Sequence, residues 1–315
     1  MKLTSSLYIT IAGFFLVGAI LLCGCTSDES PAADGNKEIH LTADIWRVME
    51  DTRTATFDNA PALQTEGSFT CAVYQAGTAT PYITETAVDW DGTASKWQFR
   101  DGKHYWPATG SLDFFAYMPA EKPSYIGAIT YAVSGEPAVP APQFTCAALP
   151  LSDTGQSSTK EFVYALTTGQ SKAAQGSTGV TLNFKHPFAR INLQWSAADH
   201  TGITINSITF KKIKNNGTCT IDGSTGNPSW ETSETSGSAA DFTAAAMGGP
   251  FLVVPQTFGG NVTIEVNATK EGDTETFTAT VATAWAAGYS YTYSFTLNFK
   301  AKELIVDTNE YTEQW

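Results

Sequence analysis

The stretch "GYSYTYSFTLNF", Gly288–Phe299, alternates large apolar residues with Ser, Thr and Asn without a break. Successive side chains of a β-strand point to opposite faces, so this period of two predicts a strand with one buried and one solvated face. Further strands are predicted along the chain, and turn residues, mostly Gly, separate them. In chain order they are EIHLTADIW (38–46), SFTCAVYQ (68–75), SLDFFAYMP (111–119), VTLNFKHPFARINLQW (180–195), GITINSITFKKI (202–213), GGPFLVVPQTF (248–258), NVTIEVNA (261–268) and ETFTATVAT (275–283).

Helical periodicity is scarce, and short helices are predicted only at Ala60–Thr65 and Ala239–Met247. Short strands without crossover helices are typical of antiparallel β-sandwiches, so the predicted fold class is all-β. Thr167–Gly179 contains no large apolar residue and is rich in Gly, Ser, Gln and Thr, which is the composition of a linker. We therefore predict an N-terminal sandwich at 54–178 and a C-terminal sandwich at 179–315.

The N-terminus has the layout of an export signal. Lys2 is the only charge before a mostly apolar run from Leu7 to Leu22, which leads into Cys23-Gly24-Cys25 and the polar residues TSDES. A zinc site needs about four ligands, and a disulfide across a single residue would be strained. "LCGC" instead resembles a bacterial lipoprotein box. On this interpretation residues 1–24 are the signal peptide, and Cys25 is the acylated first residue of the mature protein.

Two alternatives remain for this N-terminal segment. The apolar run approaches the ~20 residues that span a bilayer, so it is also compatible with an uncleaved membrane anchor. Cleavage by the ordinary signal peptidase would instead leave a soluble secreted protein.

The rest of the sequence offers little reactive chemistry. The net charge is −13 and no basic run is present, so nucleic acid is not an expected partner. The histidines have no metal-ligand spacing, and no nucleophile or phosphate-binding motif occurs, so we expect no catalytic residues, no metal and no cofactor. Carboxylates are plentiful, but no pair stands out as a glycosidase pair. Cys71, Cys146 and Cys219 lie far apart and are either buried thiols or include one disulfide.

The aromatic residues have two interpretations. Trp90 and Trp97 flank the Asp91-Gly92 turn, where exposed rings would stack on sugars. Large aromatic residues also fill sandwich cores, and we expect Trp90 to be the most exposed tryptophan.

Four stretches resemble the fimbrillin, or type V pilin, family of Gram-negative anaerobes. They are HYWPATGSLDFFAYMP (104–119), NFKHPFARINLQW (183–195), FLVVPQTF (251–258) and WAAGYSYTYSFTLNF (285–299). The resemblance implies two tandem transthyretin-like antiparallel β-sandwich domains and no enzymatic activity. The acidic "SDE" after Cys25 also resembles the signal that sends such lipoproteins to the cell surface.

The resemblance also implies an assembly mechanism. The lipoprotein reaches the outer membrane, an Arg-specific protease cuts near the mature N-terminus, and the first strand leaves with the lipid. A strand of another subunit then fills the groove. In this sequence the leader is 25–53, and the cleavage site is Arg53, in "EDTRTATFD", or Arg47. The removable strand would carry Ile39, Leu41, Ala43 and Ile45 on one face.

The tail at residues 300–315 is also strand-forming. "ELIVDTNEYTEQW" places Leu304 and Val306 on one face and ends at Trp315. It is either a donor strand for another subunit or an element that packs on its own domain.

The predicted function is a structural or adhesive subunit of a cell-surface fimbria at the outer membrane. It would be assembled by removal of the first strand and by β-strand exchange with other fimbrial subunits, with a host or bacterial surface ligand as a further partner. The alternative is a monomeric surface lipoprotein that binds glycans.

Overall fold

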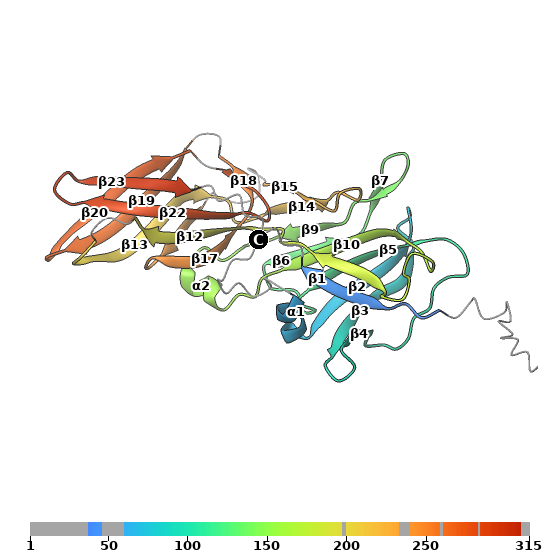
Figure 1. Ribbon diagram of the computed structural model, residues 1–315. Coiled ribbons are helices and arrows are strands. Elements are labelled where there is room, and N and C mark those ends of the chain that lie inside the picture. Colours follow the sequence, from blue (N-terminus) through green and yellow to red (C-terminus); the bar gives the residue numbers. More distant parts are fainter. Residues whose placement is uncertain are drawn as a thin grey trace, which may run out of the picture. The chain divides into compact units, whose positions relative to one another are not determined.

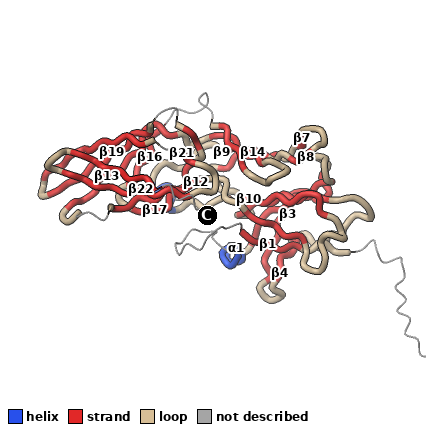
Figure 2. The backbone as a smooth tube through the Cα atoms, turned by 45° about the horizontal axis from the view of Figure 1, so that its top comes forward, coloured by secondary structure: helices blue, strands red, loops and turns tan. Residues whose placement is uncertain are grey.

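The computed structural model describes residues 37–45, 60–196, 200–232, 240–258, 261–282 and 284–309. Strands dominate this backbone (Figure 2), so the all-β prediction is confirmed. The described residues contain two short helices, α1 (Ala60–Glu66) and α2 (Asp153–Ser157). The helix predicted at Ala60–Thr65 is therefore present.

The N-terminal part of the fold is built on a seven-stranded sheet (Figure 1). Its strand order is β10 (Val163–Gln170), β5 (Leu112–Met118), β2 (Ser68–Gln75), β3 (Pro81–Asp91), β4 (Lys96–Phe99), β1 (Leu41–Ile45) and β11 (Val180–Phe184). The outer strands meet, because Tyr164 of β10 and Lys185, just after β11, exchange backbone hydrogen bonds of 3.1 and 2.7 Å. The sheet therefore closes on itself as a barrel.

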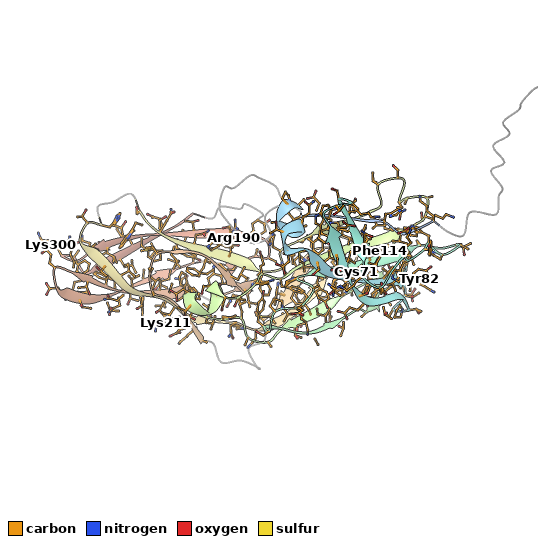
Figure 3. All side chains as sticks on the ribbon, turned by 90° about the horizontal axis from the view of Figure 1, so that it is seen from below. Cys71, Tyr82, Phe114, Arg190, Lys211 and Lys300 are labelled. Atoms are coloured by element: carbon orange, nitrogen blue, oxygen red, sulfur yellow. The ribbon has the colours of Figure 1, made fainter. Side chains whose placement is uncertain are left out.

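The barrel encloses one apolar core and shares a second with a neighbouring sheet. Leu112 and Phe114 of β5 face the barrel interior, where Cys71 also lies (Figure 3), and Leu63 of α1 joins them. Phe115 and Tyr117 point outward, which explains why every residue of β5 is buried. They pack against a four-stranded sheet in the order β15 (Pro228–Glu231), β14 (Gly217–Ile221), β9 (Gln143–Cys146) and β6 (Ile126–Thr130).

The C-terminal part is a sandwich of two four-stranded sheets around a third core. One sheet has the order β17 (Gly248–Val253), β12 (Ala189–Trp195), β22 (Ser290–Asn298) and β23 (Glu303–Asn309). The other has the order β16 (Ala240–Ala244), β13 (Ile203–Ile213), β19 (Val262–Lys270) and β20 (Asp273–Val281). Two short two-stranded ribbons complete the described strands: β7 (Val133–Ser134) with β8 (Val139–Pro140), and β18 (Gln256–Thr257) with β21 (Ala284–Trp285).

The structure differs from the sequence-based expectation at two segments. The helix predicted at Ala239–Met247 is wrong: β16 lies there, because Phe242 and Ala244 alternate into the core while the strand pairs with β13. Thr167–Gly179 does not form an open linker: β10 extends to Gln170, and the following turn buries Gln175.

Hydrogen bonding crosses the boundary predicted at 178/179. β11 pairs with β1, and β14 pairs with β9, so strands from both sides of the boundary share two sheets. The division of the chain into two sandwich domains at this boundary therefore stays a prediction.

Candidate functional site

Strand β1 occupies a position inside the barrel wall rather than at an edge. It runs parallel to β11, with five paired residues from Leu41↔Val180 to Ile45↔Phe184. On its other side Leu41 pairs with Trp97 of β4. Upstream, Ile39 N–H donates to the His104 carbonyl at 2.8 Å. Loss of β1 would leave β4 and β11 as unpaired edges, and such edges are templates for another strand.

The predicted apolar face of this strand is buried. Ile39, Leu41 and Ile45 are 3, 4 and 6% exposed, and the half-buried Ala43 packs against the same core. A strand with one apolar face is stable only when that face is covered. The alternation in the sequence therefore located the buried residues, whereas the release of the strand stays a prediction.

Residues Lys37 to His40, upstream of β1, are held by contacts that the sequence did not reveal. The Lys37 ammonium donates to the backbone carbonyls of Lys172 and Gly176, at 3.0 and 2.9 Å. Glu38 accepts a 2.8 Å hydrogen bond from Lys103. This hydrogen bond lowers the pKa of Glu38 and keeps the carboxylate charged at neutral pH.

Gln175 forms the centre of this arrangement. Its side-chain oxygen accepts hydrogen bonds from the His40 backbone at 3.1 Å and from the Trp106 indole at 2.7 Å. Its side-chain nitrogen donates to the Glu38 carbonyl at 3.1 Å. Gln175 therefore pairs with the backbone of residues 38–40 as a neighbouring strand would. These hydrogen bonds involve none of the side chains of residues 38–40.

Gly179 lets residue 40 approach closely. Its φ is +97°, and a Cβ placed there would lie 2.7 Å from the His40 carbonyl oxygen. Only glycine meets both demands, since other residues rarely adopt this backbone and contacts below 3.0 Å are not tolerated.

The C-terminal strand β23 packs on its own domain. It pairs antiparallel with β22, from Asn298↔Glu303 to Thr292↔Asn309, as the outer strand of its sheet. Leu304 is 8% exposed and Val306 is partly buried against the same core, while Ile305 is 46% exposed. The one face predicted for this strand is therefore buried, and its use as a donor stays a prediction.

Several predicted site residues lie outside the described residues: Cys25, Arg47, Arg53 and Trp315. Neither helix of the described ranges has an apolar run of membrane-spanning length. The described residues also contain no group of three or more His, Cys, Asp or Glu side chains arranged to hold a metal ion.

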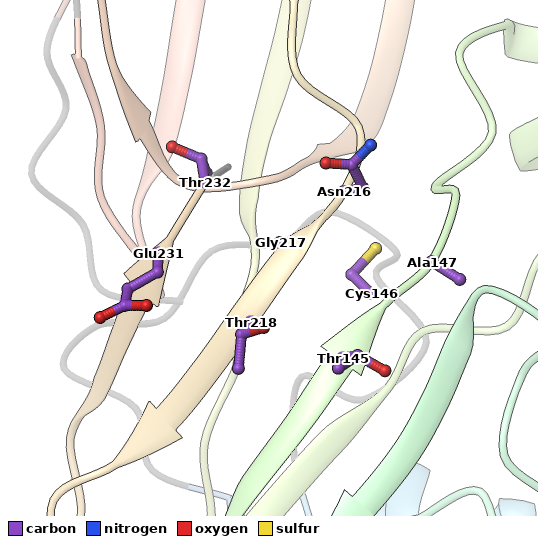
Figure 4. A pocket seen from close by; sticks show the side chains of 8 residues that line it. All are labelled: Thr145, Cys146, Ala147, Asn216, Gly217, Thr218, Glu231 and Thr232. Atoms are coloured by element: carbon purple, nitrogen blue, oxygen red, sulfur yellow. The ribbon is translucent and has the colours of Figure 1, made fainter. Parts of the chain in front are cut away.

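The three cysteines described are free thiols buried in apolar surroundings. Burial raises the pKa of Cys71 and Cys219, and it raises the pKa of Cys146 to about 12. A nucleophilic cysteine requires a thiolate, so these thiols are inert at neutral pH. Cys146 lines an open pocket of about 590 Å³ between β9, β14 and β15 (Figure 4), and its thiol is not an activated nucleophile there.

Trp90 and Trp97 belong to the barrel core rather than to an exposed sugar-binding platform. Trp97 is 6% exposed, and the partly buried Trp90 packs against the same core with its ring 5.3 Å from that of Trp97. The large aromatic side chains exposed among the described residues are those of Tyr82 and Tyr105.

His186, in the stretch NFKHPFARINLQW, forms a buried pair with Glu161. Its Nδ1 lies 2.6 Å from a Glu161 oxygen, and both side chains are at most 5% exposed. The pair joins residues that flank β10 and β12, in agreement with a structural role.

A closed β-barrel whose wall includes the first described strand, followed by a β-sandwich, defines the fold class of this chain. The family model for fimbrillin-like proteins matches residues 52–315, so the chain belongs to the fimbrillin-like family. No curated protein matches the chain in sequence.

The chain is similar to several solved structures, and the first one described here shares its fold. A candidate cell adhesion protein from Bacteroides ovatus is 17% identical with a TM-score of 0.55, over 89% of this chain and 98% of that chain. A candidate adhesin from Bacteroides thetaiotaomicron is 12% identical with a TM-score of 0.42, over 90% and 99% of the two chains. A fimbrial assembly protein from Parabacteroides distasonis is 10% identical with a TM-score of 0.37, over 86% and 99%.

Proposed function

We propose that the chain is a structural or adhesive subunit of a cell-surface fimbria. Proteolysis removes its first strand, and a strand of another subunit takes the vacated place. The position of β1 carries the proposal: it is a buried strand of the barrel wall, and it directly precedes the residues that include Arg47 and Arg53. Membership of the fimbrillin-like family and the adhesion and fimbrial descriptions of the similar structures support it.

The energetics favour a refilled groove over an empty one. Burial of Ile39, Leu41 and Ile45 at ~1.5–3 kcal/mol each gives a gross gain of about 5–9 kcal/mol for any strand that matches them. Ordering the entering strand offsets part of this gain. The empty groove exposes apolar surface and unpaired backbone groups together, so association is strongly driven.

The lipid explains how subunits stay at the surface before assembly. Acylated Cys25 anchors the uncut chain in the outer membrane, because several acyl chains together give durable attachment. Cleavage after Arg53, or after Arg47, separates the lipid and β1 from the barrel. Replacing Cys25 with Ala should abolish palmitate labelling and leave a longer precursor; labelling that persists would contradict this assignment.

The test is assembly in vitro. Purified mature chain treated with an Arg-specific protease should form a ladder of SDS-resistant oligomers. Arg53→Ala should block cleavage and ladder formation without unfolding the protein, and Arg100→Ala, directly after β4, is the matched control. Should only Arg47→Ala block, Arg47 is the cleavage site. A protein that stays monomeric after cleavage would contradict the proposal and would favour the glycan-binding lipoprotein.

A further inference from the structure

The first and last strands of the described fold begin with the same pattern. KEIHL (37–41) ends at the first residue of β1, and KELIV (302–306) spans the start of β23. In both stretches the third and fifth residues face a core: Ile39, Leu41 and Leu304 are buried and Val306 is partly buried. A strand that replaces β1 has to present the same alternation in the same phase.

Lys37 and Glu38, the Lys-Glu pair of the first stretch, bind groups that suit a cation followed by an anion. The ammonium of Lys37 binds two backbone carbonyls, and the carboxylate of Glu38 binds the ammonium of Lys103. An inverted Glu-Lys pair would bring a carboxylate to carbonyl oxygens and an ammonium to Lys103. Gln175 bonds only to the backbone of residues 38 and 40, so it accepts any side chain at position 40.

The second Lys-Glu pair is weakly held in its own domain. Lys302 forms a 2.8 Å ion pair with Glu275, but its side chain is 70% exposed, and exposed ion pairs contribute little. Its φ of +53° is unfavourable for a lysine and would be relieved in an extended strand. β23 is hydrogen-bonded to a neighbouring strand on one side only, so its release would break one ladder of backbone hydrogen bonds.

Resting on the strand exchange proposed above, we infer that Lys302-Glu303 sets the register in which β23 of a second copy enters the β1 site. Lys302 takes the place of Lys37 between the two carbonyls, and Glu303 pairs with Lys103. Leu304 and Val306 fill the positions of Ile39 and Leu41. The entering strand runs parallel to β11, and this chain is its own partner.

The same pair occurs elsewhere without this capacity. Lys160-Glu161 precedes β10, but Glu161 is buried against His186 and β10 is a fixed part of the barrel. Lys270-Glu271 lies at the turn between β19 and β20.

This register places Asp307 at the position of Thr42, where Thr42 and Thr181 hydroxyl oxygens lie 3.0 Å apart. Cysteines introduced by Asp307→Cys and Thr181→Cys should therefore form an intersubunit disulfide after cleavage, and not before. Ile305→Cys with Thr181→Cys is the control, because it is displaced by two residues. The three cysteines of the described residues, Cys71, Cys146 and Cys219, are buried, so they should not form this cross-link.

Non-reducing SDS gels of the protease-treated full chain separate the outcomes: unboiled samples show the wild-type ladder, and boiled samples show the disulfide cross-links alone. A cross-linked ladder from the 307/181 pair alone supports the inference. Two results would overturn the register and leave the proposed function intact, provided that the wild-type protein forms a ladder. One is a cross-link from the 305/181 pair, and the other is the absence of a cross-link from the 307/181 pair. Absence of any wild-type ladder overturns both.

The charges give an independent measurement. Lys302→Glu should slow ladder formation about tenfold, as expected for loss of a charge-assisted hydrogen bond, whereas Lys300→Glu, with the same change of charge, should not. Glu303→Lys should slow it similarly, and Lys103→Glu in the acceptor should restore it. Equal rates for the two lysine variants would overturn the inference.

The C-terminal end of the entering strand offers a substitution that should stabilise the assembled ladder. The register brings Glu310 to the buried position of Ile45. Replacing Glu310 with Ile should therefore raise the temperature at which the ladder dissociates in SDS; an unchanged temperature would overturn the register at this end.

Discussion

Gln175 shows how a polar residue in a low-complexity stretch becomes part of a core. Its side chain is 2% exposed and forms three hydrogen bonds to groups more than 60 residues away in sequence. Burial of an amide is tolerated because each polar atom has a partner. Composition predicted a linker here, since partners that lie far away in sequence leave no local signal.

Gly179 and Gly176 provide a matched pair of substitutions. Both have positive φ, +97° and +57°, but a Cβ at Gly176 meets no atom within 4 Å, while one at Gly179 strikes the His40 backbone. Gly176→Ala should cost about 1 kcal/mol of unfolding free energy from backbone strain alone. Gly179→Ala should cost at least about twice as much, because β1 or the glycine must shift. Urea unfolding measures both, and equal losses would contradict the close approach.

Cys146 predicts a dependence of stability on alkaline pH. Burial raises its thiol pKa to about 12 in the folded protein, whereas an unfolded thiol ionises near pH ~8.5. The unfolded state therefore loses its proton first, and the stability present below about pH 8.5 is lost progressively as the pH rises toward 12. Cys146→Ala removes this contribution.

The measurement is the difference in unfolding free energy between wild type and Cys146→Ala from pH 8 to pH 11. This difference should shrink as the pH rises. The ionisation of buried tyrosines affects both proteins equally, so its contribution cancels in the difference. A difference independent of pH would show that the thiol is not shielded.

At the scale of elements, the alternation of apolar and polar residues located the strands and their buried faces. The prediction failed where the local preference for helix or strand disagrees with the tertiary context. The faces of β1 and β23 follow from the sequence because a period of two fixes them. Ala239–Met247 looks helical from its alanines, yet pairing with β13 makes it strand β16. The parallel pairing of β1 with β11, about 140 residues apart, has no local signature at all.

Deletion of Glu303–Trp315 tests the second role of β23. Its removal exposes the edge of β22 and the core beneath Leu304, so the protein should lose stability but keep its barrel. If β23 is the donor, the cleaved variant still accepts a strand and becomes a chain terminator in mixtures with wild type. Ladders that lengthen normally in equimolar mixtures would show that another segment donates.

At the scale of the molecule, the all-β class was predictable and the closure of the barrel was not. Strand number and alternation define the class, but closure depends on the bridge between Tyr164 and Lys185, which the sequence does not distinguish. Arg47, Arg53 and Cys25 fall outside the described residues, so their roles stay predictions from the sequence.

The turn after β10 should report whether the β1 site is occupied. Lys37 binds the carbonyls of Lys172 and Gly176, and Gln175 binds residues 38–40, so the turn is held by the strand it faces. A Lys-specific protease, which spares arginine, should cut after Lys172 slowly in the intact chain and much faster once β1 is gone. Addition of a strand that fills the site, such as a peptide of residues 300–315, should restore resistance, while cleavage after the exposed Lys212 stays constant. Equal rates at Lys172 in the intact and cleaved chains would mean that β1 remains in place after cleavage.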